Sequence, residues 1–278
     1  MAKNYSKILL VTSIGHVLVH AITLILPAIL ILLESEYQLS PIQLGTLGTA
    51  QFLPFGLSSF LAGWLVDKLG SRKILIIYFA GIFISALLIG FSQSYTQLLM
   101  GFVVLGSFSG LYHPAGLNLI SRTDNLSQNM AYHGISGSIG LTLGPVIGAG
   151  IAIIFDWQTA YLFLGFISLL GLFTSVFVVN SALQIQNRIE KFHRFRISKS
   201  QITIIIVAAI WGFSHQGLFH FLPKYFSENV NTITYNSESI IENLDNDIST
   251  QNNFNNKVLK GGLLTAFVLL LGIVGQIV

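Results

Sequence analysis

The sequence predicts an all-α membrane protein, and three observations support this fold class. Only 9% of the 278 residues are charged, against about 25% in an average soluble domain. Hydrophobic residues make up 53%, and the mean hydropathy is +0.72. Eight stretches are long and apolar enough to cross a bilayer, which takes about 20 residues per helix. These features exclude a cytosolic globular enzyme and a disordered protein, and the absence of cysteine excludes a disulfide scaffold.

The predicted spans are almost free of charge. None contains Asp or Glu, and the only Lys is Lys260, at the edge of the last span. Ser40, Pro41 and Gln43 form a capping box with a proline at the first helical position, which predicts where the second span begins. Tyr78 is expected near the inner face as an interfacial aromatic. The spans cover residues 8–33, 42–66, 74–92, 96–120, 131–155, 157–179, 201–222 and 258–278.

The distribution of charge predicts the orientation. With the N-terminus inside, 11 of the 14 basic residues lie on the cytoplasmic side, as the positive-inside rule requires. We therefore expect a multi-pass protein of the plasma or inner membrane with a cytoplasmic N-terminus. The basic residues lie in short runs between spans, so the net charge of +3 does not predict nucleic-acid binding.

The order of spans predicts three regions. Residues 1–180 hold six spans and form a helical bundle, and residues 201–278 hold two more. The basic segment 181–200 between them is a cytoplasmic linker, either solvated or containing a short interfacial helix. An Asn-rich outside segment, residues 223–257, joins the last two spans and is expected to be a flexible loop.

The inside loop after the second span has the clearest mechanistic pattern. Gly63 lets a neighbouring helix come close, and Gly70 permits a tight turn. Asp67 is an acid at a helix end, beside the basic Lys68 and Arg72. It can pair with a cation or with a helix N-terminus. These residues predict a cytoplasmic latch between two helices; the alternative is an ordinary basic loop with one stray acid.

The fifth span carries a ladder of small residues four apart. Ser136, Gly140, Gly144 and Gly148 share one helix face, and Pro145 lies beside the third of them. Small residues in this pattern let helix backbones approach closely, and the proline introduces a kink. We expect this face to pack against another helix. If the face has a function beyond packing, we expect the contact to be a sliding interface.

These two motifs resemble those of major facilitator superfamily transporters. The family's signature loop, G-x-L-x-D-R-x-G-R-[RK], is matched apart from a conservative Lys and from Ser71, which stands where the family usually has Arg. The matching positions are Gly63, Leu65, Asp67, Lys68, Gly70 and Arg72. The antiporter motif G-x-x-x-G-P-x-x-G-G is matched at Gly140, Gly144, Pro145 and Gly148 and departs at Ala149.

A narrower resemblance concerns the fosmidomycin-resistance branch of drug-efflux proteins. It rests on Gly15-His16 in the first span and on the run Gly110-Leu111-Tyr112-His113-Pro114 in the fourth. The Arg that is common in the fourth helix of proton antiporters is absent. His20 stands about where this branch often has an acidic residue, so His16 or His20 would have to carry any proton coupling.

The resemblance implies the major facilitator fold, which has two six-helix halves. Here the first six-helix bundle is complete, and only the first two helices of the C-terminal bundle follow. A faint repeat relates Leu47, Thr49 and Ala50 to Leu263, Thr265 and Ala266. We therefore expect a truncated transporter; a natural eight-helix protein is the alternative.

Histidines supply the polar chemistry of the predicted spans. His16 and His20 share one face of the first span, His113 precedes Pro114 in the fourth, and His133 opens the fifth. An ionisable residue inside a span is a candidate for a substrate or proton pathway; the alternative is a neutral ring bonded to a backbone carbonyl. Only His16 and His20 have metal-ligand spacing, without a supporting carboxylate, so we predict neither a metal site nor a cofactor.

The function that the resemblance implies is secondary active transport by alternating access. We expect proton-coupled export of a small polar or amphipathic, drug-like compound by a monomer in a lipid bilayer. The alternatives are an importer of a small organic solute and a non-transporting, truncated or regulatory membrane protein. An enzyme is not expected, because no Ser/His/Asp or paired-carboxylate set lies at membrane depth.

Overall fold

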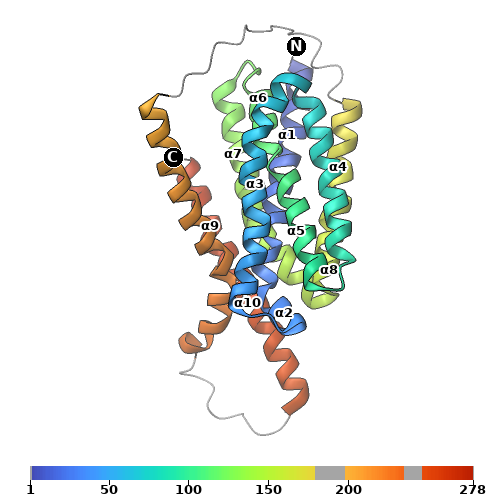
Figure 1. The fold of residues 1–278 in the computed structure, drawn as a ribbon, viewed down its shortest axis with the longest axis vertical. Helices are drawn as coiled ribbons and strands as arrows, with labels where there is room; N and C mark the ends of the chain where they lie inside the picture. Colours follow the sequence, from blue (N-terminus) through green and yellow to red (C-terminus); the bar gives the residue numbers. More distant parts are fainter. Residues whose placement is uncertain (1, 179–197, 235–245, 278) are drawn as a thin grey trace.

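The computed structural model describes residues 2–178, 198–234 and 246–277, and these residues contain helices but no strand. The helices are α1 (Ala2–Thr23), α2 (Ile25–Tyr37), α3 (Pro41–Leu69), α4 (Ser71–Gly90), α5 (Tyr95–Ser109), α6 (Tyr112–Ile120), α7 (Leu126–Ile154) and α8 (Trp157–Phe173). A π-helical turn (Thr174–Val178) follows α8, and α9 (Lys199–Thr234) and α10 (Asn246–Ile277) come last. In Figure 1 the helices α1 to α8 stand side by side as one bundle, and α9 and α10 lie against it.

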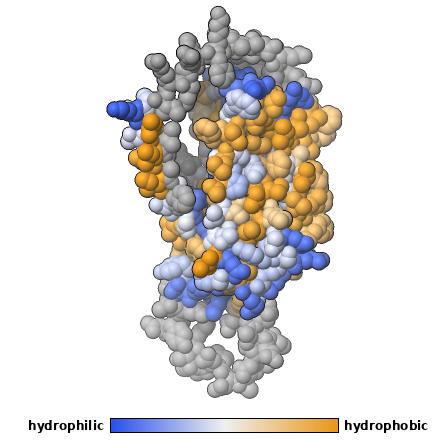
Figure 2. Space-filling model, viewed as in Figure 1, coloured by the Kyte–Doolittle hydropathy of each residue, from blue (hydrophilic) through white to orange (hydrophobic). Residues whose placement is uncertain are grey.

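Within these ranges, six segments are long and apolar enough to cross a membrane. They are Ser6–Tyr37, Pro41–Leu69, Ser71–Gly90, Tyr95–Ile120, Leu126–Ile154 and Trp157–Phe177. They coincide with the first six predicted spans, which are thereby confirmed. Figure 2 shows an apolar belt on the flank of the bundle, with hydrophilic residues at both ends. Helices α9 and α10 occupy the places of the seventh and eighth predicted spans, whose crossing of the membrane stays a prediction.

Helix α3 begins where its capping box predicts. The hydroxyl of Ser40 accepts from the backbone N–H of Gln43, and the side chain of Gln43 accepts from the backbone N–H of Ser40 at 2.9 Å. Pro41 is the first residue of the helix. Both halves of the capping box therefore satisfy backbone donors that a helix N-terminus leaves without partners.

Two spans are broken near a proline, and α3 repairs both breaks. Pro27 has no N–H, so the carbonyl of Thr23 four residues earlier lacks its helical donor. The side-chain amide of the buried Gln51 donates to this carbonyl at 2.8 Å. Pro114 frees the carbonyl of Gly110 in the same way. The hydroxyl of Ser59, two turns further along α3 than Gln51, donates to it at 2.9 Å.

The small-residue ladder of α7 packs against the first span. A Cβ on Gly140 would lie 2.3 Å from the carbonyl oxygen of Val17, and one on Gly144 would lie 2.7 Å from that of Ala21. Further along, Gly148 lies against α2. The ladder therefore brings two backbones of the same bundle into contact.

Other residues of α7 contact α10. A Cβ on Gly262 of α10 would lie 2.8 Å from the Cβ of Ala149 and 2.9 Å from the carbonyl oxygen of Pro145. At Gly262 the contact with α10 thus lies beside the glycine ladder, and whether this contact slides stays a prediction.

Helices α9 and α2 meet at the end of the bundle away from the N-terminus. Lys224 of α9 forms an ion pair with Glu34 of α2 and a second one, at 3.0 Å, with Glu228. Nearby, His220 donates from Nε2 to the carbonyl of Leu44 on α3 at 3.1 Å. Figure 1 shows α9 close to α3 at this end and apart from it toward the N-terminal end.

The Asn-rich segment differs from its prediction. We expected a loop over residues 223–257, but α9 continues to Thr234 and α10 begins at Asn246. The two helices pack closely there, since a Cβ on Gly261 would lie 2.4 Å from the carbonyl oxygen of Pro223. This contact stabilises helix in a sequence of low helical propensity. Residues 235–245, and residues 181–197 of the predicted linker, lie outside the described residues.

Removing the amide donor of Gln51 tests its role at the first break. We expect Gln51→Met, which keeps the side-chain length, to lower the free energy of unfolding by about 1 kcal/mol. Thr49→Val is the matched control, because the Thr49 hydroxyl is exposed and bonds the carbonyl of Gly45 in its own helix. Unfolding by SDS in mixed micelles measures both variants. An equal loss in the two would contradict the role of Gln51.

Candidate functional site: a histidine cluster in the first bundle

The four histidines of the predicted pathway lie together. His16 and His20 come from α1, His113 from α6 and His133 from α7. The rings of His16 and His133 are stacked, with centroids 3.9 Å apart and planes at 17°. The centroid of the His20 ring is 4.9 Å from that of His16, and the centroid of His113 lies 5.2 Å from His16 and 5.4 Å from His20. Three helices thus converge on one imidazole cluster.

Glycines make the room that the cluster needs. A Cβ on Gly137 of α7 would lie 2.5 Å from Cε1 of His16, and a Cβ on Gly15 would lie 2.3 Å from the ring of Tyr112. Larger residues at these two positions would collide with the rings. The imidazole of His16 therefore sits directly against the backbone of α7.

Two buried tyrosines fix α1 beside the cluster. The hydroxyl of Tyr112 donates to the carbonyl of Thr12, and that of Tyr78 donates to the carbonyl of Gly15 at 3.0 Å. Tyr78 is fully buried, so its expected place at the membrane interface is wrong. Its position near the start of the span suggested an interface, whereas the bond to α1 draws it into the bundle. The sequence pattern contains no signal for this partner.

The hydrogen bonds of His16 identify its tautomer. Its Nδ1 lies 2.7 Å from the carbonyl oxygen of His133, and a carbonyl only accepts, so Nδ1 carries the hydrogen. In the neutral ring Nε2 then has a free lone pair. The Nε2 atom of His20 lies 3.1 Å from it and donates to it. His16 is therefore oriented by a backbone group on one side and presents a basic nitrogen on the other.

Burial separates the four rings into two pairs. His16 and His133 are 8% and 3% exposed, while His20 and His113 are half-buried. Neither ring nitrogen of His133 has a hydrogen-bond partner among the described residues. A buried polar atom without a partner costs about 1–3 kcal/mol, so binding of a further donor or acceptor at these nitrogens would be favourable.

Two further histidines lie elsewhere. His215 and His220 both belong to α9 and take no part in the cluster. His220 is buried in the contact with α3, and His215 is exposed. The neutral ring of His220 therefore joins α9 to α3 through a backbone carbonyl.

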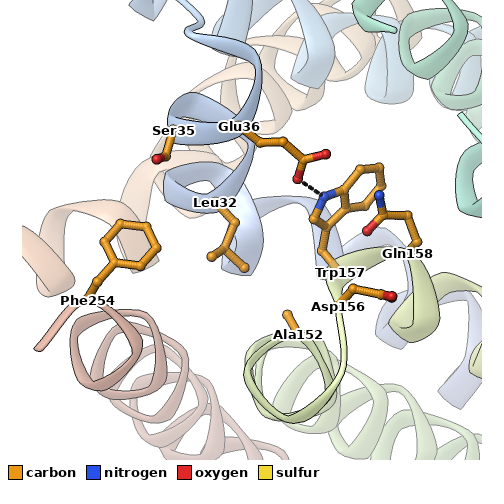
Figure 3. Close-up of a pocket in the computed structure, with 8 residues that line it drawn as sticks. All are labelled: Leu32, Ser35, Glu36, Ala152, Asp156, Trp157, Gln158 and Phe254. Carbon is orange, nitrogen blue, oxygen red and sulfur yellow. Dashed lines mark hydrogen bonds between the residues drawn. The ribbon is translucent and has the colours of Figure 1, made fainter. Parts of the chain in front are cut away.

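A depression of about 480 Å³ lies at the end of the bundle away from the N-terminus (Figure 1), and none of the clustered histidines lines it. It is lined by Leu32, Ser35, Glu36, Ala152, Asp156, Trp157, Gln158 and Phe254 (Figure 3). Its charged groups already have partners: Trp157 donates to Glu36 at 2.6 Å, and Asp156 caps α8 by accepting from the backbone of Thr159 at 2.6 Å. We therefore place the candidate site at the histidines.

Comparison with protein families decides the relationship. The sequence pattern of the Major Facilitator Superfamily matches residues 12–278. The chain belongs to the Major Facilitator Superfamily. This confirms the resemblance and the predicted fold class, and it agrees with the expectation that the protein is not an enzyme.

Individual relatives of this superfamily member include transporters of different kinds. The probable sulfoacetate transporter SauU of Cupriavidus necator is 28% identical over 141 residues, which are 50% of this chain and 33% of that protein. A multi-drug resistance efflux pump PmrA homolog of Lactococcus lactis is 31% identical over 119 residues, 42% of this chain and 29% of that protein. The aligned part is thus about a third of the length of these curated relatives.

A solved structure shows the same fold. That of the peptide transporter POT in complex with sulfate superposes with a TM-score of 0.55, covering 82% of this chain and 51% of that chain. The sequences are 13% identical, so the likeness concerns the fold alone.

In this superfamily member the signature loop ties three helices together. Arg72, at the start of α4, donates to the carbonyls of Ser175 at 2.9 Å and Val176 at 2.6 Å, in the turn that follows α8. Ser71, where the family usually has Arg, donates to Oδ1 of Asn118 on α6 at 2.8 Å. The acceptors of Arg72 are backbone groups, which no sequence pattern reveals.

The remaining residues of the loop are more exposed. Gly70 has a φ of 83°, which favours glycine and permits the turn from α3 to α4. Lys68 lies over the ring of Trp64, with Nζ 3.8 Å from the centroid. Asp67 is exposed and forms no ion pair within the described part of the chain. Among the described residues the close helix approach expected at Gly63 is not found, since a Cβ there would meet none of their atoms within 4 Å.

A methyl group at position 137 tests the packing of the cluster. Gly137→Ala forces the His16 ring away from α7, and we expect a loss of about 1–3 kcal/mol in stability. Gly150→Ala is the control on the same helix, because a Cβ there meets nothing within 4 Å. This control should be neutral or slightly stabilising, since Ala favours helix over Gly. Thermal unfolding followed by tryptophan fluorescence compares the two; a stable Gly137→Ala protein would refute the tight fit.

Proposed function

We propose that the protein is a secondary active transporter that moves a small polar or amphipathic solute by alternating access. The observation that carries this proposal is the one-ended contact between the first bundle and α9. At one end Glu34 and Lys224 join α2 to α9. Toward the other end α9 leans away, and its side chains are largely exposed, Ile204 by 66% and Ile210 by 64%. Helix α9 thus contacts the first bundle at one end, while α10 packs along α7, and a pair of helices held in this way is suited to rocking about a central site.

The predicted orientation gives the two ends their roles. With the N-terminus inside, the Glu34–Lys224 contact lies on the outer side, so the arrangement corresponds to an inward-facing state. The signature loop then lies on the inner side, where Gly63, Asp67, Lys68, Gly70 and Arg72 form the proposed cytoplasmic latch. The exposed carboxylate of Asp67 is available for a partner in the opposite, outward-facing state.

Helix α7 links the cluster to the proposed movement. One face of it, with Gly140 and Gly144, packs on α1, which carries His16. The adjoining face, with Pro145 and Ala149, contacts α10. A shift of α10 is therefore transmitted to the helix against which the His16 ring rests.

The finer proposal is proton-coupled export, with His16, His20, His113 and His133 along the substrate and proton pathway. Ionisable side chains at membrane depth usually mark such pathways, and no predicted span contains a carboxylate that could serve instead. The likeness to a multi-drug efflux pump homolog favours export. In proteoliposomes, an imposed proton gradient should drive movement of drug-like cations or neutral compounds against their own gradient. The absence of any solute movement would favour the non-transporting, regulatory alternative.

A second candidate function is the uptake of a small organic anion. The probable sulfoacetate transporter among the relatives favours it, and so does a cluster that contains imidazoles but no carboxylate. The same proteoliposomes, tested with sulfonates and carboxylates in both directions, distinguish the two candidates.

Weakening the Glu34–Lys224 ion pair should change the balance between the inward-facing and outward-facing states. We expect Glu34→Gln to reduce the ratio of closed to open outer ends about two- to fivefold, since a partly exposed ion pair contributes up to about 1 kcal/mol. The chain has no cysteine, so spin labels on Gln38→Cys and Asn229→Cys report the separation of α2 and α9. Glu36→Gln is the control, because Glu36 bonds Trp157 within the first bundle. An unchanged distance distribution in Glu34→Gln would count against the proposed closure.

Neutralising the acid of the signature loop should impair transport. Asp67→Asn is expected to lower the transport rate about tenfold without loss of folded protein, because it removes the charge of the proposed latch. Asp124→Asn is the control, as Asp124 is an exposed acid in the next loop on the same side. Transport at the wild-type rate in Asp67→Asn would remove the latch from the mechanism.

A further inference from the structure

We propose that His16, His20 and His113 form a binding site for a divalent transition-metal ion of the zinc class. Spacing along the sequence pairs only His16 with His20, which is too few ligands for a metal site, and for that reason no metal site is expected from the sequence. The fold adds a third imidazole from α6. These histidines also belong to the proposed pathway, but the metal site does not rest on transport, since a protein that binds the metal and moves no solute would still have it.

The ligand atoms have the right spacing. One ring nitrogen from each histidine lies within 4.8 Å of the other two. In a tetrahedral zinc site with Zn–N distances of about 2.0–2.1 Å, the nitrogens are about 3.3 Å apart. The Nε2 atoms of His16 and His20 are already 3.1 Å apart, and metal binding moves the hydrogen of the His20 ring from Nε2 to Nδ1. The half-buried side chain of His113 then needs to move by no more than about 1.5 Å to complete three ligands.

An independent observation concerns the second nitrogen of His16. Histidines that bind metals usually donate their other N–H to a carbonyl or carboxylate, which fixes the tautomer and aims the lone pair at the metal. The Nδ1 atom of His16 donates to the carbonyl of His133 at 2.7 Å. The hydroxyl of Ser136 donates to the same carbonyl at 2.8 Å. The lone pair on Nε2 of His16 therefore points to the side where His20 lies.

The donor set selects the metal. The cluster offers imidazole nitrogens and no carboxylate, which suits Zn²⁺, Ni²⁺, Co²⁺ or Cu²⁺ and does not suit Mg²⁺ or Ca²⁺. Three protein ligands leave the fourth position of a tetrahedral ion open. A water molecule or an anionic solute can occupy that position.

The test measures binding and not transport. The whole chain, purified in mild detergent through a tag without histidine, is titrated with Zn²⁺ by calorimetry and with Co²⁺ by visible spectroscopy. We expect one ion per chain with a tetrahedral Co²⁺ spectrum, and no binding of Mg²⁺. His20→Gln and His113→Gln should each weaken binding at least tenfold, while the control His215→Gln, on α9, leaves it unchanged.

Two outcomes would overturn the proposal. One is the absence of stoichiometric Zn²⁺ binding to the folded wild-type chain, and the other is equal binding by wild type and His113→Gln. His113→Cys separates ligation from packing, because a thiolate is also a zinc ligand. It should restore binding that His113→Gln loses and shift the Co²⁺ spectrum toward that of a thiolate site.

Discussion

The carbonyl oxygens of Thr23 and Gly110 lie at membrane depth without their helical donors, because Pro27 and Pro114 have no N–H. In lipid no water satisfies such groups, so each must find a partner within the protein. Helix α3 provides both partners, through Gln51 and Ser59. The rest of the bundle depends on this arrangement, since it holds the first and fourth spans at fixed positions along one helix.

The histidine cluster follows from these two anchored breaks. His20 comes just before the break in the first span, and His113 comes just after the break in the fourth. Because both breaks are bonded to α3, the two histidines are brought to the same level of the bundle. The tyrosine bonds to α1 and the glycine face of α7 then fix the remaining geometry, and His16 becomes the centre of the cluster.

Features with local causes could be predicted from the sequence. The capping box at Ser40, the six spans and the family motif in the loop each depend on residues close together in the chain. Features with distant partners could not. Nothing near Gln51 or Arg72 in the sequence shows that each bonds a backbone carbonyl of another helix. The same holds for Tyr78, whose partner lies 63 residues away, and for the helical ends of the Asn-rich segment, which the contact between α9 and α10 stabilises.

The break at Leu24 divides the first span into two parts with different attachments. The part before it, α1, carries His16 and His20 and is held by α7. The part after it, α2, ends near Glu34, which is bound to α9. At the break the amide of Leu24 donates to the carbonyl of His20 at 3.2 Å, and the bond from Gln51 of α3 to the carbonyl of Thr23 makes this point a fixed pivot. The span can therefore act as a hinged lever, in which a pull on its outer arm changes the angle at the residue next to the imidazoles.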